Sequence, residues 1–275
     1  MPTFEHSNTT IAYQTQGKGP PMLFIQGVGV PGSGWSPQLE GLSDRFQCAA
    51  FDHRGLGGSS PVKGRLEIAD LVGDTLALMD HLGWADAHLV GHSMGGVIAQ
   101  QLALDARTRV RSLSLLCTFC RGKDAVRLSP WIAWVGLRTR VGSRPMRRRA
   151  FLEMILPPSQ RRGADLVALA SHYGALFGRD LAEQPPVVMK QLQALAGHDQ
   201  RVRLQELGGL PTLVVSGAED RLALPRYGRA LAGAIRGARY YQFADAAHGL
   251  PLAQPEQVNS LLAQHLAAAE AGRGK

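Results

Sequence analysis

Short apolar runs alternate with segments of helical spacing along most of the chain. The runs that predict strands are residues 11–14, 22–25, 48–51, 87–90, 110–116, 212–216 and 239–243. The segments that predict helices are residues 37–42, 66–82, 94–104, 227–234 and 255–269. Short buried strands that alternate with helices are typical of a mostly parallel sheet with helices on both faces, so we expect an α/β fold.

The middle of the chain breaks this alternation. Residues 119–208 contain no convincing strand and two Pro-Pro pairs, at 157–158 and 185–186, so they predict several helices inserted between two strands. We therefore expect a core of residues 1–118 and 209–275 and a helical cap, or lid, of residues 119–208. An insertion at the carboxyl end of a parallel sheet would lie over the crevice in which such sheets bind ligands.

The composition fits one large core. The chain has 275 residues, of which 45% are hydrophobic and 19% charged. Three cysteines are too few for a disulfide framework and fit a reducing compartment. The N-terminus lacks the pattern of a signal peptide and no apolar run is long enough to span a bilayer, so we expect a cytoplasmic protein with no transmembrane segment.

The formal net charge is +8. Such a balance is compatible with a nucleic-acid partner, but no nucleic-acid motif accompanies the arginines, so none is expected. Cys117 and Cys120 form a C-x-x-C pair. Because no second pair completes a zinc site, chance spacing is the better interpretation, and no metal is expected.

One motif carries a specific chemistry. The segment 91–95, GHSMG, is a G-x-S-x-G that follows a predicted strand and opens a predicted helix, the context that a nucleophilic serine requires. The glycines allow the two backbones to approach, and the Ser93 hydroxyl would stand at the helix N-terminus, where negative charge is favoured. The alternative is a glycine-rich turn with an exposed serine, and the strand-to-helix context favours the nucleophile.

Two further residues complete a catalytic constellation. A serine needs a base to take its proton, and the base needs a third group to fix its tautomer. Asp220 follows the run 212–216 and His248 follows the run 239–243. A parallel sheet brings the carboxyl ends of its strands to one edge, so Ser93, Asp220 and His248 should meet there. Glu219, Asp245 and Asp124 are weaker candidates for the acid.

The chain resembles the α/β-hydrolase superfamily, in the branch of small bacterial esterases, haloperoxidase-like enzymes and 3-oxoadipate enol-lactonases. The resemblance rests on the serine motif, on the segment 52–59, DHRGLGGS, which is similar to the family's D-x-R-G-x-G-x-S turn, and on GAED at 217–220. It covers almost the whole chain outside the middle segment. It implies the α/β-hydrolase fold, Asp220 as the acid, His248 as the histidine, and a cap inserted after the sixth strand of that fold, here residues 110–116.

The resemblance also implies an oxyanion hole made of two backbone N–H groups. One would belong to Met94, after the nucleophile, and the other to Val28, in the loop after the strand at 22–25. The family usually has His-Gly-x in that loop, whereas this chain has Gln26-Gly27-Val28. A backbone donor survives this change, but the fine positioning of the loop is open.

The same loop offers a rival interpretation. Residues 27–32 also read G-x-G-x-x-G after a strand, and Asp52 lies twenty residues further on, which is the pattern of a dinucleotide-binding oxidoreductase. Pro31 and Pro37 interrupt the place where a long helix should begin. The rival also leaves the serine, aspartate and histidine unexplained.

The cap contains two features that bear on specificity. Arginines gather between residues 138 and 162: Arg138, Arg140, Arg144, Arg147, Arg148, Arg149, Arg161 and Arg162. They form either a solvated helix face or a field that attracts a carboxylate-bearing substrate. Trp131 and Trp134 belong to an apolar stretch that packs on the core, forms the wall of an apolar acyl pocket or touches lipid, and we favour packing with partial lining of the pocket.

The sequence therefore predicts a serine hydrolase that cleaves a carboxylic ester through an acyl-enzyme and needs no cofactor. Its partner would be a small-molecule ester or lactone, and its oligomeric state is open. An enol-lactonase, a carbon–carbon bond hydrolase or a perhydrolase could use the same three residues. A non-catalytic ligand-binding relative is the alternative of a different class. We expect the cap to control which substrates enter and not the chemistry.

Overall fold

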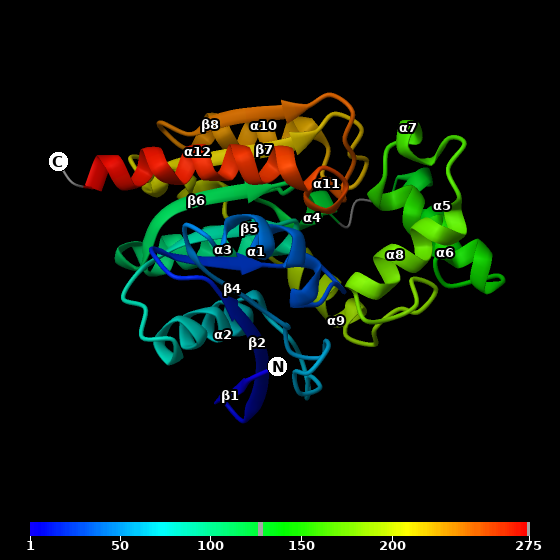
Figure 1. Ribbon diagram of the computed structural model, residues 1–275, viewed down its shortest axis with the longest axis horizontal. Helices are drawn as coiled ribbons and strands as arrows, with labels where there is room; N and C mark the ends of the chain where they lie inside the picture. Colours follow the sequence, from blue (N-terminus) through cyan, green and yellow to red (C-terminus); the bar gives the residue numbers. More distant parts are fainter. Residues whose placement is uncertain (126–128, 274–275) are drawn as a thin grey trace.

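Eight strands form one sheet in the order β1-β2-β4-β3-β5-β6-β7-β8 (Figure 1). The computed structural model describes residues 1–125 and 129–273. The strands are β1 (Thr3–His6), β2 (Thr9–Gln16), β3 (Pro21–Ile25), β4 (Gln47–Phe51), β5 (Ala87–His92), β6 (Val110–Leu116), β7 (Thr212–Gly217) and β8 (Arg239–Phe243). From β4 to β8 all neighbours are parallel, whereas β1 and β2 pair antiparallel at one edge. The expected α/β fold with a mostly parallel sheet is confirmed.

Helices cover both faces of the sheet. The core helices are α1 (Ser36–Leu42), α2 (Ile68–His81), α3 (Met94–Asp105), α10 (Pro225–Ala234), α11 (Leu250–Ala253) and α12 (Pro255–Arg273), with 3-10 turns η1 (Gly32–Trp35), η2 (Arg107–Arg109) and η3 (Arg201–Leu207). Helix α12 packs on α1 and β6 on one face, and α3 packs on α2, β5 and β6 on the other. In the crossovers after β5 and β7, the helices α3 and α10 each pack on the strand that precedes them.

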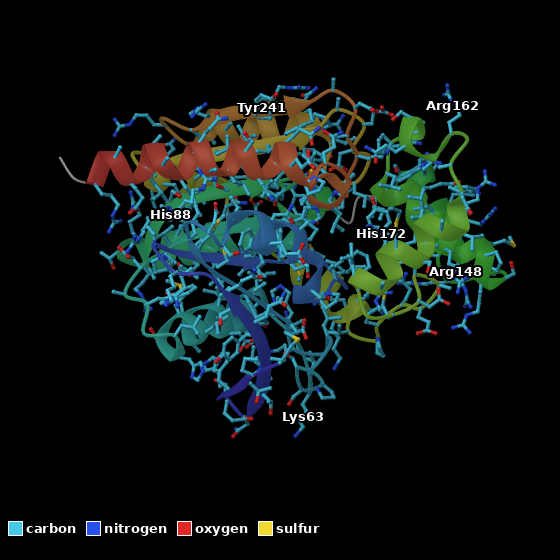
Figure 2. All side chains as sticks on the ribbon, viewed as in Figure 1. Lys63, His88, Arg148, Arg162, His172 and Tyr241 are labelled. Atoms are coloured by element: carbon cyan, nitrogen blue, oxygen red, sulfur yellow. The ribbon has the colours of Figure 1, made fainter. Side chains whose placement is uncertain are left out.

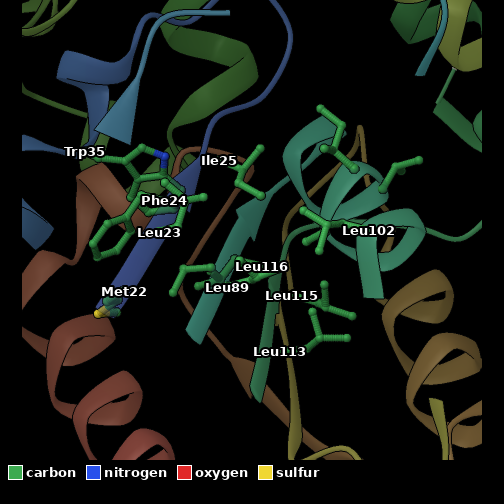
Figure 3. Close-up of a cluster of buried hydrophobic side chains, with 14 of the residues drawn as sticks. Met22, Leu23, Phe24, Ile25, Trp35, Leu89, Leu102, Leu113, Leu115 and Leu116 are labelled. Atoms are coloured by element: carbon green, nitrogen blue, oxygen red, sulfur yellow. The ribbon is translucent and has the colours of Figure 1, made fainter. Parts of the chain in front are cut away.

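The apolar runs become the interior of the sheet. In β3, the residues Met22, Leu23, Phe24 and Ile25 are fully buried, and Leu89 of β5 lies beside them (Figure 3). Strands covered on both faces lose the in-out alternation of half-exposed strands, which is why these runs are continuous in the sequence.

The strand β1 was missed in the sequence. Its four residues alternate between exposed and buried side chains at the edge of the sheet, so they present no compact apolar run. The other strands lie where they were expected, with ends that differ by no more than two residues. The last helix is longer than expected, because α12 continues to Arg273.

Residues 119–208 hold helices and one isolated bridge, between Arg121 and Asp199, in the part that the structure describes. The helices are α4 (Gly122–Ala125), α5 (Pro130–Arg138), α6 (Arg144–Ile155), α7 (Pro158–Arg161), α8 (Leu166–Leu176) and α9 (Val188–Ala196). Helices α5 to α8 form a lobe beyond the end of the sheet at which α11 lies (Figure 1).

The lobe has its own apolar cluster. Its buried members are Phe151, Leu152, Ile155, Leu156, Ala170, Tyr173, Phe177 and Leu181. In contrast, Leu195 on α9 and Leu204 in η3 belong to the main core. The division into a core and a cap of 119–208 stays a prediction, and the packing divides the cap segment into an outer lobe and a part that lies on the sheet's helices. None of the helices in the described ranges has the length and apolar content needed to cross a bilayer.

Candidate active site

Ser93 occupies the turn between β5 and α3 in a backbone conformation that side chains rarely adopt, with φ 55° and ψ −118°. The flanking glycines explain why the turn is possible. A Cβ on Gly91 would lie 2.4 Å from the Gly95 carbonyl oxygen, and a Cβ on Gly95 would lie 1.9 Å from the Ile25 carbonyl oxygen. The motif therefore needs glycine at both positions, because the helix backbone approaches both neighbouring strands.

His248 and Asp220 lie in the loops after β8 and β7. His248 Nε2 is 3.0 Å from Ser93 Oγ, and His248 Nδ1 is 2.8 Å from Asp220 Oδ2. All three side chains are buried, with Asp220 only 1% exposed. The sheet thus brings the three sequence-predicted residues together at its carboxyl edge.

The Asp220 carboxylate is oriented by its own loop. Its Oδ1 accepts the N–H groups of Leu222 and Ala223, both at 2.8 Å, which leaves Oδ2 for the histidine. A carboxylate accepts and does not donate, so the proton on His248 resides on Nδ1 and the lone pair of Nε2 faces the serine hydroxyl. This is the tautomer in which a histidine can take a proton from Ser93.

The other candidate acids have different partners. Asp245 accepts a hydrogen bond from the Ser159 hydroxyl, and Asp124 lies 3.8 Å from the Arg121 guanidinium. Glu219, beside Asp220, is exposed. Among the residues that the structure describes, Asp220 alone has a carboxylate oxygen within 4.0 Å of a ring nitrogen of His248.

His92 lies behind the histidine. Its Nε2 is 2.8 Å from the His248 carbonyl oxygen, and its Nδ1 is 3.1 Å from Gln26 Oε1. Burial, together with the nearby His248, lowers the pKa of His92 to about 3, so the ring is neutral near pH 7 and has one N–H for two acceptors. These contacts make His92 a hydrogen-bonded neighbour of the site.

The loop after β3 places the N–H of Val28 between two N–H groups that are hydrogen-bonded. The Gly27 N–H donates to Gln26 Oε1 at 2.8 Å, and the Gly29 N–H donates to Gln191 Oε1 at 2.8 Å. The N–H of Val28, between them, has no partner among residues 1–125 and 129–273. Met94 is the first residue of α3, and the first N–H groups of a helix have no partner within it.

The dinucleotide pattern in this loop has another explanation. Asp52 Oδ1 accepts the Gly32 N–H at 2.7 Å and Oδ2 accepts the Gly58 N–H at 2.9 Å, so the carboxylate holds two loops of the core together. The glycine-rich loop leads into η1 and a seven-residue helix, α1, and not into a long helix. Both observations count against a ribose-binding role for Asp52.

The two tryptophans of the cap lie against arginines. The Arg221 guanidinium is 4.3 Å from the centre of the Trp131 ring, and Arg138 lies 5.1 Å from the centre of the Trp134 ring. Trp134 is 44% exposed. Trp131 therefore joins the cap to the residue after Asp220, and a role of either ring in substrate binding stays a prediction.

Three side chains near the site had no motif in the sequence. Thr118 donates to the Ser93 carbonyl oxygen at 2.6 Å, Gln191 accepts the Gly29 N–H, and Arg179 donates to the Gly29 carbonyl oxygen at 3.0 Å. Gln191 and Arg179 contact a residue at least 150 positions away in the chain, so no local pattern could reveal them. No group of three or more potential metal ligands occurs among the described residues.

The fold and this geometry match known proteins. A family model described as the alpha/beta hydrolase fold matches residues 20–253. The chain belongs to the α/β-hydrolase fold family. This hydrolase is 32% identical over 264 residues to BpoC of Mycobacterium tuberculosis, provisionally named a non-heme bromoperoxidase, covering 95% of this chain and 99% of BpoC.

Two further relatives lie in the same branch. RutD of Azorhizobium caulinodans, provisionally named a carbamate hydrolase, is 28% identical over 262 residues, 95% of this chain and 97% of RutD. The crystal structure of the enol-lactonase from Burkholderia xenovorans LB400 superposes on this structure with a TM-score of 0.81 at 28% sequence identity. The superposition covers 97% of this chain and 100% of the enol-lactonase. The expected resemblance to the haloperoxidase-like and enol-lactonase branch is confirmed.

Proposed function

We propose that this α/β hydrolase is a serine hydrolase that cleaves a carboxylic ester by a Ser93–His248–Asp220 triad. The observation that carries the proposal is the chain of two contacts, 3.0 Å from Ser93 Oγ to His248 Nε2 and 2.8 Å from His248 Nδ1 to Asp220 Oδ2. Both distances lie within the range over which a base can take a hydroxyl proton and a carboxylate can orient the base.

The reaction would begin with the serine. His248 Nε2 takes the proton as Ser93 Oγ attacks the ester carbonyl, and Asp220 stabilises the imidazolium that forms. The N–H groups of Val28 and Met94 would donate to the oxyanion. The Val28 N–H is unpaired among the residues that the structure describes, which supports this assignment, because a donor that is already bonded within the protein could not serve. Removing one such donor costs roughly 10²–10³ in kcat.

His248 would then return its proton to the departing alcohol, and the carbonyl carbon would remain bound to Ser93 as an acyl-enzyme. A water molecule, deprotonated by His248, would attack that ester, and His248 would return the proton to Ser93 Oγ as the acid is released. All proton transfers use one histidine, so no metal or cofactor is required by this mechanism.

A lactone is the second candidate substrate. The observation that favours a lactone is that the enol-lactonase from Burkholderia xenovorans LB400 shares the fold over nearly the whole chain. Lactones and esters follow the same steps, and the difference is that the leaving alcohol stays attached to the acyl group.

The proposed location of the protein is the cytoplasm, because its three cysteines are free, as is usual in a reducing compartment.

The decisive test combines labelling with substrates. A fluorophosphonate probe should label the native protein and should fail to label a Ser93→Ala variant. A series of p-nitrophenyl esters of increasing chain length, assayed beside a lactone panel, should then identify the acyl preference. Failure of the probe to label the native protein, with no turnover of any ester or lactone, would favour a non-catalytic ligand-binding protein.

A further inference from the structure

Two side chains of the segment 119–208 bind both polar groups of a single residue in the loop after β3. Gln191, on α9, accepts the Gly29 N–H at 2.8 Å. Arg179, in the loop after α8, donates from Nη2 to the Gly29 carbonyl oxygen at 3.0 Å. Gly29 follows Val28 directly, so both bonds act on the residue next to the proposed oxyanion donor.

The contact with α9 is close and buried. Gln191 is fully buried, and Gly29 has φ +70°. A Cβ on Gly29 would lie 2.8 Å from Val188 Cγ2, also on α9. Glycine is therefore required at this position both by the backbone conformation and by the close approach of α9.

Arg179 is held in turn by aromatic rings. Its guanidinium lies 5.8 Å from the centre of the Phe151 ring and 5.9 Å from that of Phe177, both members of the lobe's apolar cluster. Nη1 donates to the Glu183 carbonyl oxygen. Arg179 is partly buried, and this burial lowers the pKa of its guanidinium from the usual value. The lobe's interior is thus connected to Gly29 through one constrained side chain.

Within the described part of the chain, these bonds leave the N–H group of Val28 available. Gly27 donates to Gln26, Gly29 donates to Gln191, and the Val30 N–H points to the Gly27 carbonyl oxygen at 3.5 Å. Val28, partly buried, keeps its N–H unpaired among the described residues. The Val28 N–H belongs to the Gly27–Val28 peptide, and the bonds of the Gly27 and Gly29 N–H groups fix the peptides before and after it. An oxyanion hole works because its donors are oriented before the reaction, so bonds that fix the flanking peptides also restrict the orientation of this donor.

We propose that Gln191 and Arg179 are positioning residues that orient the Val28 N–H for transition-state stabilisation, and that the cap segment is therefore coupled to the chemistry itself. The inference rests on the proposed serine-hydrolase function. It differs from the expectation drawn from the sequence, which was that the cap controls substrate entry and not the chemistry. Displacement of α9 from Gly29 would release the loop and weaken the oxyanion hole even with substrate bound.

The test compares Gln191→Met with Gln191→Glu. Methionine has a similar length but no acceptor oxygen, whereas glutamate keeps one. With a p-nitrophenyl ester, Gln191→Met should lower kcat by roughly 10- to 100-fold and leave KM nearly unchanged. This loss is no larger than the loss expected when an oxyanion donor is removed altogether. Gln191→Glu should restore most of kcat. Arg179→Met removes the second bond and should also lower kcat more than it raises KM.

A second readout isolates the oxyanion hole. A trifluoromethyl ketone that matches the ester forms a tetrahedral adduct on the serine, and its affinity should fall in parallel with kcat/KM in Gln191→Met. A ground-state competitor without an electrophilic carbonyl should bind the variant and the native protein equally. A purely structural role would weaken both ligands to the same extent.

Lys190 supplies the matched control. It is the neighbour of Gln191 on α9, and its Nζ donates to the Val62 and Gly64 carbonyl oxygens at 2.9 Å each, away from Gly29. Lys190→Met removes a bond between the same helix and another loop of the core, and it should leave kcat and ketone affinity unchanged. The proposal fails if Gln191→Met retains native kcat, or if Lys190→Met lowers kcat equally. Loss of labelling in Ser93→Ala tests the serine mechanism separately, so the two failures are distinguishable.

Discussion

The hydroxyl of Thr118 donates a hydrogen bond of 2.6 Å to the carbonyl oxygen of Ser93. The Ser93 N–H donates at 3.0 Å to the carbonyl oxygen of Leu116, so the end of β6 and the residues after it hold both polar backbone groups of the strained serine. Residues with positive φ persist only when their surroundings over-determine them. The neighbouring strand therefore helps to keep the Ser93 hydroxyl in place beside His248.

Ser93→Ala should abolish ester hydrolysis and leave the fold intact. Alanine has a side chain no larger than serine, and the close approaches at Gly91 and Gly95 involve backbone atoms and not the hydroxyl. Loss of a triad member costs roughly 10⁴ to 10⁶ in kcat. Steady-state assays with p-nitrophenyl esters measure the loss, and circular dichroism checks the fold. Substantial activity in a well-folded variant would refute the assignment of the nucleophile.

Thr118→Val should slow acylation without destroying the site. Valine has the shape of threonine but cannot donate to Ser93, and the carbonyl keeps the Gly96 N–H at 3.0 Å. The free energy of unfolding should fall by about 1 kcal/mol, as for a typical intramolecular hydrogen bond. The fluorophosphonate labelling rate should fall with it. Unchanged labelling and unchanged urea denaturation would mean that the elbow does not depend on this bond.

Asp220→Asn should be far more damaging than Asp245→Asn or Asp124→Asn. An asparagine cannot stabilise the imidazolium and favours the wrong tautomer of His248, which costs roughly 10⁴ in kcat. The other two carboxylates bind Ser159 and Arg121 instead of the histidine. Comparison of kcat for the three variants at one pH is sufficient. A larger loss in Asp124→Asn would place the acid after β6.

The comparison of sequence and structure separates local signals from distant ones. Ser93, Asp220 and His248 could be predicted because each follows an apolar run, and parallel strands end at one edge. Gln191 and Arg179 could not, because each contacts Gly29 from at least 150 residues away and neither lies in a motif. Such contacts depend on how the cap folds back on the core, which is a property of packing and not of periodicity.

The arginine cluster illustrates the same limit. Within residues 138–162 the sequence offers one acidic residue, Glu153. The structure brings Asp180, from the loop after α8, within 2.7 Å of Arg148 and 3.1 Å of Arg144. These two arginines hold the pKa of the Asp180 carboxyl well below its usual range. The patch is therefore less positive than its sequence suggests.

The protein should lose stability as the pH falls below 6.5. Burial and the charge of Arg111 lower the pKa of His88 from 6.5 to about 3, and burial also lowers that of His92 to about 3. Between pH 6.5 and about pH 3, these histidines bind protons in the unfolded chain but remain neutral in the folded protein. The free energy of unfolding therefore falls as the pH falls through this range. Each such group contributes a loss of about 1.4 kcal/mol per pH unit.

Urea denaturation at about pH 7.5, about pH 6 and about pH 5, which spans the usual range of histidine titration, measures this slope. His88 lies at the end of the molecule away from the lobe (Figure 2), so His88→Gln should flatten the slope by about one proton without touching the active site. Its loss of the Ser112 contact, 2.8 Å from Nδ1, should lower stability at all pH values. An unchanged slope in the variant would show that His88 does not contribute.

Charge reversal at Arg147, Arg148 and Arg149 should affect stability more than substrate choice. Arg148 binds Asp180 through two nitrogens, at 2.8 and 2.7 Å, and Arg149 lies 3.2 Å from Glu153. Arg148 also points away from the sheet (Figure 2). Glutamates at these positions would face Asp180 and Glu153, so the melting temperature should fall. An anionic and a neutral ester should respond alike.

The measurement is kcat/KM for a matched anionic and neutral ester, in the native protein and the triple variant, at low and high salt. Steering by a cluster facing the site would give the anionic ester a kcat/KM that falls with salt, because screening acts over roughly 10 Å at 0.1 M. The ion pairs on the outer lobe predict instead equal salt responses for the two esters, in both proteins. A selective fall for the anionic ester in the triple variant would show that the arginines attract substrate, and it would return the cluster to the interpretation as a carboxylate-binding field.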